Sequence, residues 1–362
     1  MKIGIDATLA ARPRIVGISR FVVNLVARLA EMPGDEEYYL CYRPRALRYP
    51  RLIWRPRDSR FHIRLLAPLN PGLFRRLDVY HATDNRLPSY HGRVPLLGSL
   101  HDIVYLSQPQ MGSTRTRTRW QARYRDVAAR AQLIMTLSEF SKSEIVRLLG
   151  VPPQRVRVVP LAPSSSYVPQ PPQVVAEVRR RYGLQQPYIL FGGGLGRRKN
   201  PLGALHAFAR AVTRLPADLR FTLAGSGDLE AQAREFIRAA NLTDRVTLLG
   251  FVPEADNPAL ITGSLFYFFP SLLEGFGLPA VEAMACGAPL LASGTTSLPE
   301  VCGDAALLVD PQDEARLADG LVELAANPSL RATLAQRGLR HVQQFTWQRV
   351  AETIRQLYHE LA

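Results

Sequence analysis

The sequence has few cysteines, few lysines and no long apolar run. Cys41, Cys286 and Cys302 are scattered and form no Cys-x-x-Cys pair, which argues against a disulfide framework and a zinc site and favours the reducing cytoplasm. No apolar stretch approaches the roughly 20 residues of a membrane span, and Asp6 interrupts the early apolar stretch, so neither a transmembrane helix nor a signal peptide is expected. The sequence also lacks an Asp-x-Asp motif.

Positive charge is concentrated in the first part of the chain. Residues 1–165 contain 27 Arg or Lys against 12 Asp or Glu, whereas residues 166–362 contain 18 against 19, so the first part carries the whole excess behind the net charge of +14. Arginines cluster in residues 43–57 and 115–125. These clusters indicate an anionic acceptor, a lipid diphosphate or an anionic membrane face, with general solubility as the simpler alternative.

The pattern of strands and helices indicates an α/β protein with two domains. At 362 residues the chain exceeds the size at which one core keeps growing. Strand-like runs alternate with helical patterns in both parts of the chain, which predicts two Rossmann-like, doubly wound domains. The break between them is expected around residues 162–187, a stretch that begins with the proline- and serine-rich APSSSYVPQPPQ. The strand-like runs are KIGID, YYLCY, HIRLLA, DVYHA, PLLGSL, LIMTLS, VRVVP, YILFGG, FTLAG, VTLLG, LFYFFP, PLLAS and ALLVD.

The stretch PSLLEGFGLPAVEAMACG, residues 270–287, places two carboxylates around a glycine-rich turn. The preceding run LFYFFP has strand length and the glycines forbid its continuation, so Glu274 is predicted on a loop at a strand end. A short helix is predicted over 280–286, and the unpaired N–H groups of its first turn suit a diphosphate. Glu274 is expected to bind sugar hydroxyls and Glu282 ribose hydroxyls. The alternatives are a solvated Glu274 and a Glu282 stabilised by the helix dipole alone.

The Glu-x7-Glu spacing in EGFGLPAVEAMACGAPLLAS, followed by SLPEVCGDAALLVDP over residues 297–311, resembles the retaining GT-B glycosyltransferases of family GT4. The resemblance runs from MKIGIDATLA at the start to FTWQRVAETI near the end. It implies the GT-B fold, two Rossmann-like doubly wound domains facing each other across a cleft, with Glu274 in a catalytic role. It also implies that the nucleotide sugar contacts a set of residues in the motif: Gly275, Phe276, Gly277, Leu278 and Glu282.

The resemblance also divides the chain. The last helix of the family crosses back onto the first domain, so a first, acceptor-binding domain is expected over 1–165 together with 345–362. The donor-binding domain is then expected over 166–344.

A second cluster, YILFGGGLGRRKNP over residues 188–201, leads from a strand-like run through glycines to cations before an amphipathic helix. That order suits the binding of phosphate oxygens. Its RKN sequence resembles the family's diphosphate-binding element, which assigns Arg198 and Lys199 to the diphosphate. A solvated charge run is disfavoured because cations at a helix N-terminus oppose its dipole. Gly194, expected beside the donor, stands where the family commonly has an arginine, and Arg197 is the candidate to replace that charge.

Further candidates lie at the ends of other strand-like runs. Gly17, just before a helical pattern, is expected to meet the diphosphate. His101 belongs to an HD pair that in the resembled family lies beside the transferred sugar, whereas Asp102 is expected to orient or cap. By resemblance the base lies near Gly250 and Phe251, although ordinary turns explain these strand ends almost as well.

These signals predict a glycosyltransferase that moves a hexose from a nucleoside diphosphate sugar, GDP-mannose or a UDP-sugar, to a hydroxyl of a glycan or lipid-linked acceptor. Retention follows from the resemblance, and the segments VYHATD and LHDIV resemble the mannosyltransferase branch. No cofactor or metal ion is expected, because Arg198, Lys199 and the two helix starts can neutralise the departing diphosphate. A cytoplasmic enzyme is expected, with contact to the inner membrane face left open.

Three alternatives belong to other classes. A glycoside hydrolase also uses two carboxylates, but it has no use for a phosphate site. A nucleotide-sugar epimerase shares the resembled fold and would alter the donor without an acceptor. A basic nucleic-acid-binding protein is suggested by charge alone, without a recognisable binding motif, so nucleic acid is not an expected partner.

Overall fold

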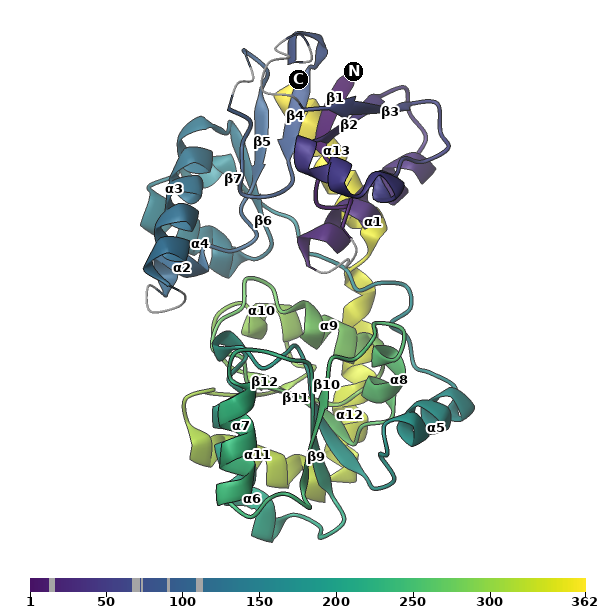
Figure 1. The fold of residues 1–362 in the computed structure, drawn as a ribbon, viewed down its shortest axis with the longest axis vertical. Helices are drawn as coiled ribbons and strands as arrows, with labels where there is room; N and C mark the ends of the chain where they lie inside the picture. Colours follow the sequence, from purple (N-terminus) through teal and green to yellow (C-terminus); the bar gives the residue numbers. More distant parts are fainter. Residues whose placement is uncertain (13–16, 67–71, 73, 90–91, 109–112) are drawn as a thin grey trace. The chain divides into compact units, whose positions relative to one another are not determined.

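The computed structural model describes residues 1–12, 17–66, 72, 74–89, 92–108 and 113–362. The chain divides into two compact units (Figure 1). The first unit comprises Met1–Leu161 and Phe345–Ala362, and the second comprises Ala162–Gln344. The division therefore falls after Leu161, where the sequence suggested residue 165. Within the described ranges, none of the helices combines the length and the apolar character that a membrane span requires.

The first unit is built on a parallel sheet whose seven described strands follow the order β3-β2-β1-β4-β5-β6-β7. Every neighbouring pair is parallel, as expected when helical crossovers separate the strands. Helices cover both faces, so most of the strands are buried and apolar. The strands are β1 (Lys2–Asp6), β2 (Glu37–Tyr42), β3 (Phe61–Leu65), β4 (Val79–Ala82), β5 (Leu96–Ser99), β6 (Leu133–Thr136) and β7 (Val156–Val158).

One face of this sheet packs against α3 and α4, which contribute Tyr124, Val127 and Ile145 to the core. Helices α1 and α13 pack together on the other face (Figure 1). Residue bounds of the helices are α1 (Ile18–Glu31), α2 (Val104–Ser107), α3 (Thr114–Arg130), α4 (Glu139–Leu149) and α13 (Trp347–Leu361). The described residues of this unit also form short 3-10 helices in connections that lead to strands: η1 (Pro44–Arg48), η2 (Pro50–Leu52), η3 (Phe74–Arg76) and η4 (Pro153–Arg155).

The C-terminal helix α13 is bound to the first unit by buried polar contacts as well as by its apolar face. Arg355 donates to the buried carboxylate of Glu36 over 2.6 Å. The ring Nδ1 of His81, itself fully buried, lies 2.8 Å from the hydroxyl of Tyr358. These contacts join residues more than 270 positions apart in the sequence.

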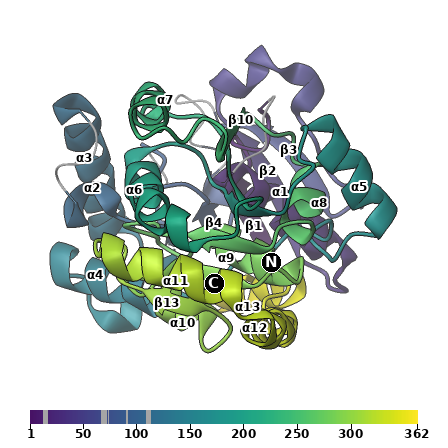
Figure 2. The same ribbon diagram turned by 90° about the horizontal axis from the view of Figure 1, so that it is seen from below.

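The second unit holds a parallel sheet of six described strands in the order β10-β9-β8-β11-β12-β13. Helices α6, α7 and α11 cover one face, and their apolar side chains form a core with Phe191, Phe221 and Phe268. Helices α8, α9 and α12 lie over the other face (Figures 1 and 2). The strands are β8 (Tyr188–Phe191), β9 (Arg220–Ala224), β10 (Val246–Gly250), β11 (Phe266–Phe269), β12 (Leu290–Ser293) and β13 (Leu307–Val309).

Helices α6 to α11 alternate with the strands of the second unit, while α5 precedes β8 and α12 follows α11. They are α5 (Pro172–Arg181), α6 (Pro201–Ala211), α7 (Glu230–Ala239), α8 (Asn257–Thr262), α9 (Leu278–Ala285), α10 (Leu298–Cys302), α11 (Glu314–Ala326) and α12 (Pro328–His341). The 3-10 helices are η5 (Arg197–Lys199), η6 (Val212–Arg214) and η7 (Val342–Gln344).

The structure confirms the doubly wound α/β prediction, since each of the thirteen strand-like runs coincides with a strand. Two local expectations need correction. The stretch 162–187, expected as a break, contains the helix α5, whose Val178 is buried. Helix α9 begins at Leu278, two residues before the predicted start, because Gly277 takes a left-handed conformation and Pro279 suits the first turn.

In both sheets the strand order reverses next to the first strand of the unit. The reversal lies between β1 and β4 in the first unit and between β8 and β11 in the second. In open α/β sheets, ligands bind outside the carboxyl ends of the strands at this point. The loops after β8 and β11 are the two motif-bearing loops of the second unit.

Candidate active site

In the second unit the side chain of Glu274 joins the two motif-bearing loops. Its Oε1 accepts a hydrogen bond from Lys199 Nζ over 2.6 Å, and its Oε2 accepts one from Arg198 Nη1 over 3.3 Å. Glu274 is 4% exposed and Lys199 8%. The ammonium of Lys199 also lies 4.7 Å from the centre of the Phe269 ring, at the end of β11. The adjacency of β8 and β11 therefore brings three predicted residues into one cluster, in which Lys199 and Glu274 are buried and Arg198 is partly exposed.

This cluster keeps Glu274 ionised. Burial raises the pKa of its carboxyl, but the charges of Lys199 and Arg198 and the hydrogen bonds outweigh burial, so the net pKa is lowered. Burial also lowers the pKa of Lys199, with Glu274 opposing that effect. A buried ion pair of this kind is costly to desolvate and depends on complete hydrogen bonding.

Residues that the sequence analysis did not single out complete the hydrogen bonding of Glu274. The hydroxyl of Ser271 lies 2.6 Å from Oε1 of Glu274 and 2.9 Å from the carbonyl oxygen of Arg198. The hydroxyl of Thr296 accepts a hydrogen bond from the backbone N–H of Glu274, and the hydroxyl of Ser297 donates one to the backbone carbonyl of Glu274. Thr296 has a positive φ of 59°, which costs conformational energy in a non-glycine residue. The spacing Ser-x-x-Glu was the available signal for Ser271, whereas nothing local links residues 296 and 297 to Glu274.

The glycines after β8 allow close packing with the next loop. Gly194 has φ +91°, and a Cβ on Gly225 would lie 2.6 Å from the Cα of Gly194. Gly225 in turn donates its N–H to the carbonyl of Gly250 over 2.7 Å. Gly194 and Gly250 are thus connected through Gly225 along the carboxyl ends of β8, β9 and β10. Close packing therefore requires glycine at Gly225, whereas Gly194 and Gly250 are favoured as glycine by their positive φ of 91° and 68°.

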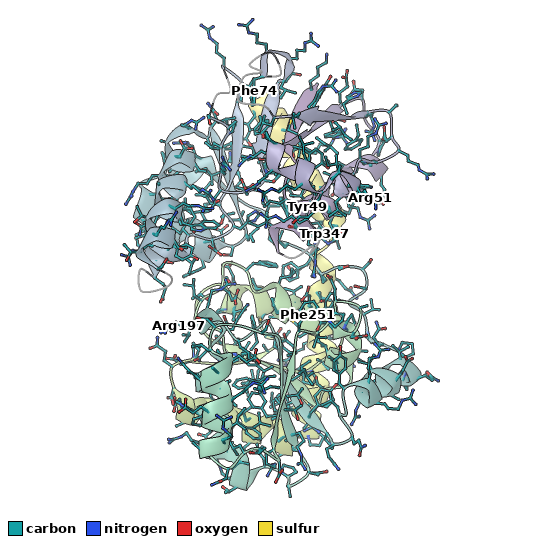
Figure 3. The ribbon with its side chains drawn as sticks, in the orientation of Figure 1. Tyr49, Arg51, Phe74, Arg197, Phe251 and Trp347 are labelled. Atoms are coloured by element: carbon teal, nitrogen blue, oxygen red, sulfur yellow. The ribbon has the colours of Figure 1, made fainter. Side chains whose placement is uncertain are left out.

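Phe251 follows Gly250 at the carboxyl end of β10 and is 60% exposed (Figure 3). Arg197, also labelled in Figure 3, is exposed at the start of η5. The ion pairs with Glu274 are made by Arg198 and Lys199, the two residues that follow Arg197.

The motif after Glu274 leads directly into α9. Gly275 and Phe276 are buried, and Gly277 holds φ +93°, where a Cβ would lie 2.4 Å from Leu298. Leu278 is the first helical residue, so Glu282 lies beyond the first turn. The dipole of the helix therefore stabilises the carboxylate of Glu282 only weakly, although this residue is just 8% exposed. This corrects the sequence-based alternative that Glu282 is placed by the dipole alone.

In the first unit, His101 lies two residues after β5. Its Nε2 is 2.9 Å from the carbonyl oxygen of Thr83. Its ring packs edge to face with that of Phe21, with ring centres 5.2 Å apart. Because a carbonyl only accepts, Nε2 carries the proton. Burial lowers the pKa of His101, with the bond to Thr83 opposing, so the ring is neutral near neutral pH. Asp102 accepts the backbone N–H of Val104 at the start of α2, as expected of an orienting residue.

Gly17 immediately precedes α1, and no described atom lies within 4 Å of where a Cβ would stand. Gly17 and His101 are connected through α1, which carries Phe21. The remaining predicted residues lie in the second unit: Gly194, Arg198, Lys199, Gly250, Phe251, Glu274, Gly275, Phe276, Gly277, Leu278 and Glu282. Within the described ranges, no three His, Cys, Asp or Glu side chains gather as a metal site would require. All three cysteines are buried free thiols.

The family model "Glycosyl transferases group 1" matches residues 176–359, and the model "Glycosyltransferase Family 4" matches residues 15–162. The chain belongs to the group 1 glycosyltransferases. The resemblance drawn from the Glu-x7-Glu motif is confirmed, and so is the prediction of a hexosyltransferase.

Two relatives of this glycosyltransferase are 32% identical to it. One is "O-antigen chain mannosyltransferase B" of Escherichia coli, over 96% of this chain and 97% of the relative. The other is "MMP alpha-(1->4)-mannosyltransferase" of Mycolicibacterium hassiacum, over 62% of this chain and 53% of the relative.

Among solved structures, the glycosyltransferase superposes on Anabaena HepE in complex with UDP and glucose. The TM-score is 0.78 with 19% identity, over 99% of this chain and all of that one. At this identity the likeness shows the fold, which is GT-B.

Proposed function

We propose that this glycosyltransferase transfers a hexose from a nucleoside diphosphate sugar to a hydroxyl of a glycan or lipid-linked acceptor, with retention of configuration and without a metal ion. The cluster of the partly exposed Arg198 with the buried Lys199 and Glu274 carries the proposal. It lies at the strand reversal of the second sheet, where a nucleotide is expected. It offers both the cations that a diphosphate needs and a carboxylate for sugar hydroxyls.

The cations act on the leaving group. Negative charge develops on the diphosphate as its bond to the sugar breaks, and fixed positive groups stabilise that charge best in a dry site. In this proposal Arg198 and Lys199 bind the diphosphate together with backbone N–H groups at the start of α9. Glu274 holds both cations in position before the donor binds, and it accepts a hydrogen bond from a sugar hydroxyl afterwards.

The other predicted residues contribute to binding in the same proposal. Glu282 binds the ribose hydroxyls. Phe251, whose ring is largely exposed, packs on the base beside Gly250. In the first unit, His101 supports the positive charge that develops on the transferred sugar, and the backbone after Gly17 binds phosphate.

Mannose is the sugar we propose, with GDP-mannose as the donor. Two relatives at 32% identity are named as mannosyltransferases, and one of them aligns over nearly the whole chain. The name of that relative also points to the acceptor class, a growing glycan chain.

A thermal-shift screen across GDP-, UDP- and ADP-sugars tests the donor. A ligand at a hundred times its dissociation constant adds about 2.7 kcal/mol of stability, so GDP-mannose should raise the melting temperature clearly. Arg198→Ala should abolish this shift. The matched variant Arg210→Ala, which removes an exposed arginine from α6, should keep it. A shift of the same size in all three proteins would refute the assignment of the diphosphate site.

Product analysis tests the reaction. With GDP-mannose and a mannose-containing acceptor, proton NMR of the product should show an α-linked mannose, and a chelator should leave the rate unchanged. A β-linked product would exclude retention. A rate that is lost with the chelator and restored by Mg²⁺ would exclude the metal-independent mechanism.

A further inference from the structure

The connection between β2 and β3 exposes an unusual number of large apolar side chains. We call residues 44–57 the 44–57 segment; it contains η1 and η2. Leu47 is 53% exposed, Tyr49 44%, Leu52 37% and Trp54 40%. Among the described residues, only five other large hydrophobic side chains are exposed to this extent, and they are Ile63, Leu65, Val168, Val174 and Phe251. Single exposed apolar residues are ordinary, whereas four within eight positions indicate a binding surface.

The same segment carries positive charge without compensation in the sequence. No Asp or Glu occurs between Tyr42 and Asp58. Five arginines, all exposed, alternate with the apolar residues: Arg45, Arg48, Arg51, Arg55 and Arg57. Tyr49 and Arg51 are labelled in Figure 3. The occupant of this surface must therefore be both negatively charged and able to take up apolar side chains.

The backbone of the 44–57 segment is held in place at both ends. The hydroxyl of Tyr42, at the end of β2, donates to the carbonyl of Trp54 over 2.6 Å. Ala46 is 2% exposed, and Arg43 is buried in an ion pair with Asp6 over 2.7 Å. The N–H groups of Tyr49 and Leu52 close the 3-10 turns. The exposed side chains are thus presented by a fixed backbone, which lowers the entropy lost on binding.

We propose that the 44–57 segment docks the enzyme on the surface of an anionic phospholipid bilayer. Tyr49 and Trp54 have the amphipathic rings that favour the membrane interface, and Leu47 and Leu52 add apolar area. The arginines extend along the interface and bind lipid phosphates. Apolar insertion and charge attraction act together, since either signal alone gives only weak attachment. Nucleic acid fits less well, because leucine side chains offer it no stacking surface.

Docking through this segment would bring one edge of the first unit to the bilayer. The segment follows the carboxyl end of β2, and His101 follows the carboxyl end of β5 in the same parallel sheet. The carboxyl ends of parallel strands lie at one edge of a sheet. An acceptor anchored in the same bilayer would meet this edge. The docking itself does not depend on the proposed donor or reaction.

Co-sedimentation with lipid vesicles tests the proposal. The protein should bind vesicles of phosphatidylglycerol and phosphatidylcholine, bind vesicles of phosphatidylcholine alone far more weakly, and lose affinity as salt is added. The double variant Leu47→Ser/Trp54→Ser should lose binding. Arg51→Gln/Arg55→Gln should weaken it about twenty-five-fold, since each cation near an anionic surface contributes about fivefold.

Matched controls come from the second unit. Val174→Ser and Arg238→Gln remove an exposed apolar residue and an exposed arginine there, and both should bind as the unchanged protein does. Thermal unfolding of each variant checks that it is folded. Trp54→Phe keeps an aromatic ring at this position but removes the indole, so it should abolish the blue shift of tryptophan fluorescence that vesicles cause.

Several results would overturn the proposal. Equal binding to neutral and anionic vesicles would exclude charge attraction. Unchanged binding by the segment variants, or loss caused instead by Arg115→Gln/Arg117→Gln in α3, would exclude this surface. Tighter binding to duplex DNA than to vesicles, lost in the same segment variants, would assign the surface to nucleic acid.

Discussion

The buried pair of Lys199 and Glu274 should be strongly coupled in stability. Its atoms lie 2.6 Å apart, and both side chains are at most 10% exposed. Lys199→Met keeps the apolar stem but leaves the carboxylate of Glu274 with the partly exposed Arg198 and the hydroxyl of Ser271 as side-chain partners. Removing one partner of such a pair costs about 3–5 kcal/mol, because the remaining charge stays buried. Glu274→Gln keeps the shape and should cost about 2–3 kcal/mol.

The double variant should be less destabilised than the sum of the two single variants, because neither charge then remains unpaired. We expect a coupling free energy of about 2 kcal/mol in a double-mutant cycle. Urea unfolding followed by circular dichroism measures it. Both single variants and the double variant should also lose transferase activity, whatever their stability.

A surface ion pair in the same unit gives the matched control. Arg234 and Glu230 lie 2.8 Å apart on α7, with side chains 52% and 32% exposed. Their cycle, Arg234→Met and Glu230→Gln, should give a coupling of about 0.5 kcal/mol or less, since solvent screens exposed pairs. Equal coupling in the two cycles would refute the argument that burial, rather than distance, sets the strength of the Lys199–Glu274 pair.

Three further predictions concern pH, backbone conformation and positioning. Burial lowers the pKa of His81 to about 3, from a usual 6.5. The free energy of unfolding should therefore fall by up to about 1.4 kcal/mol per pH unit as the pH drops from about 6.5 to 3. His81→Gln should remove this slope in acid unfolding. Gly225→Ala should lower the melting temperature much more than Gly250→Ala, because both have positive φ but only at the first would the Cβ meet backbone within 3 Å; equal losses would contradict this. Ser271→Ala should lower kcat while leaving the KM for the donor nearly unchanged, because the hydroxyl of Ser271 orients the carboxylate of Glu274. Ser271→Thr should restore part of the rate in the same kinetic assay. A change in KM alone would count against a positioning role.

Much of the architecture follows from local sequence. The strand-like runs matched the strands because parallel strands covered on both faces are short apolar segments that glycine or proline ends. Gly17, Gly277 and Pro279 marked two helix starts because their backbone preferences act locally. Helix α5 was not predicted, because its region begins with a proline-rich stretch and the helix itself has one buried residue, Val178, and therefore a weak apolar pattern.

The candidate site depended on tertiary structure. Lys199 and Glu274 are 75 residues apart in the sequence. They meet because β8 lies between β9 and β11 in the sheet, so the loops after β8 and β11 are neighbours. Thr296, which accepts a hydrogen bond from the backbone N–H of Glu274, is likewise brought there by the fold from 22 residues away. Ser271 lies only three residues before Glu274, so its contact is local. Similarly, Glu36 receives Arg355 from 319 residues away because α13 packs on the first unit.

The sequence by itself determined which segments form strands and helices, and it supplied the residues that we propose bind phosphate and sugar, because propensity, periodicity and motif spacing are local properties. Only the tertiary structure decided which of these residues touch, how deeply each charge is buried and which distant hydroxyls hold the backbone of Glu274. Those features depend on strand order and on packing between distant segments, and neither is encoded in any single stretch of the chain.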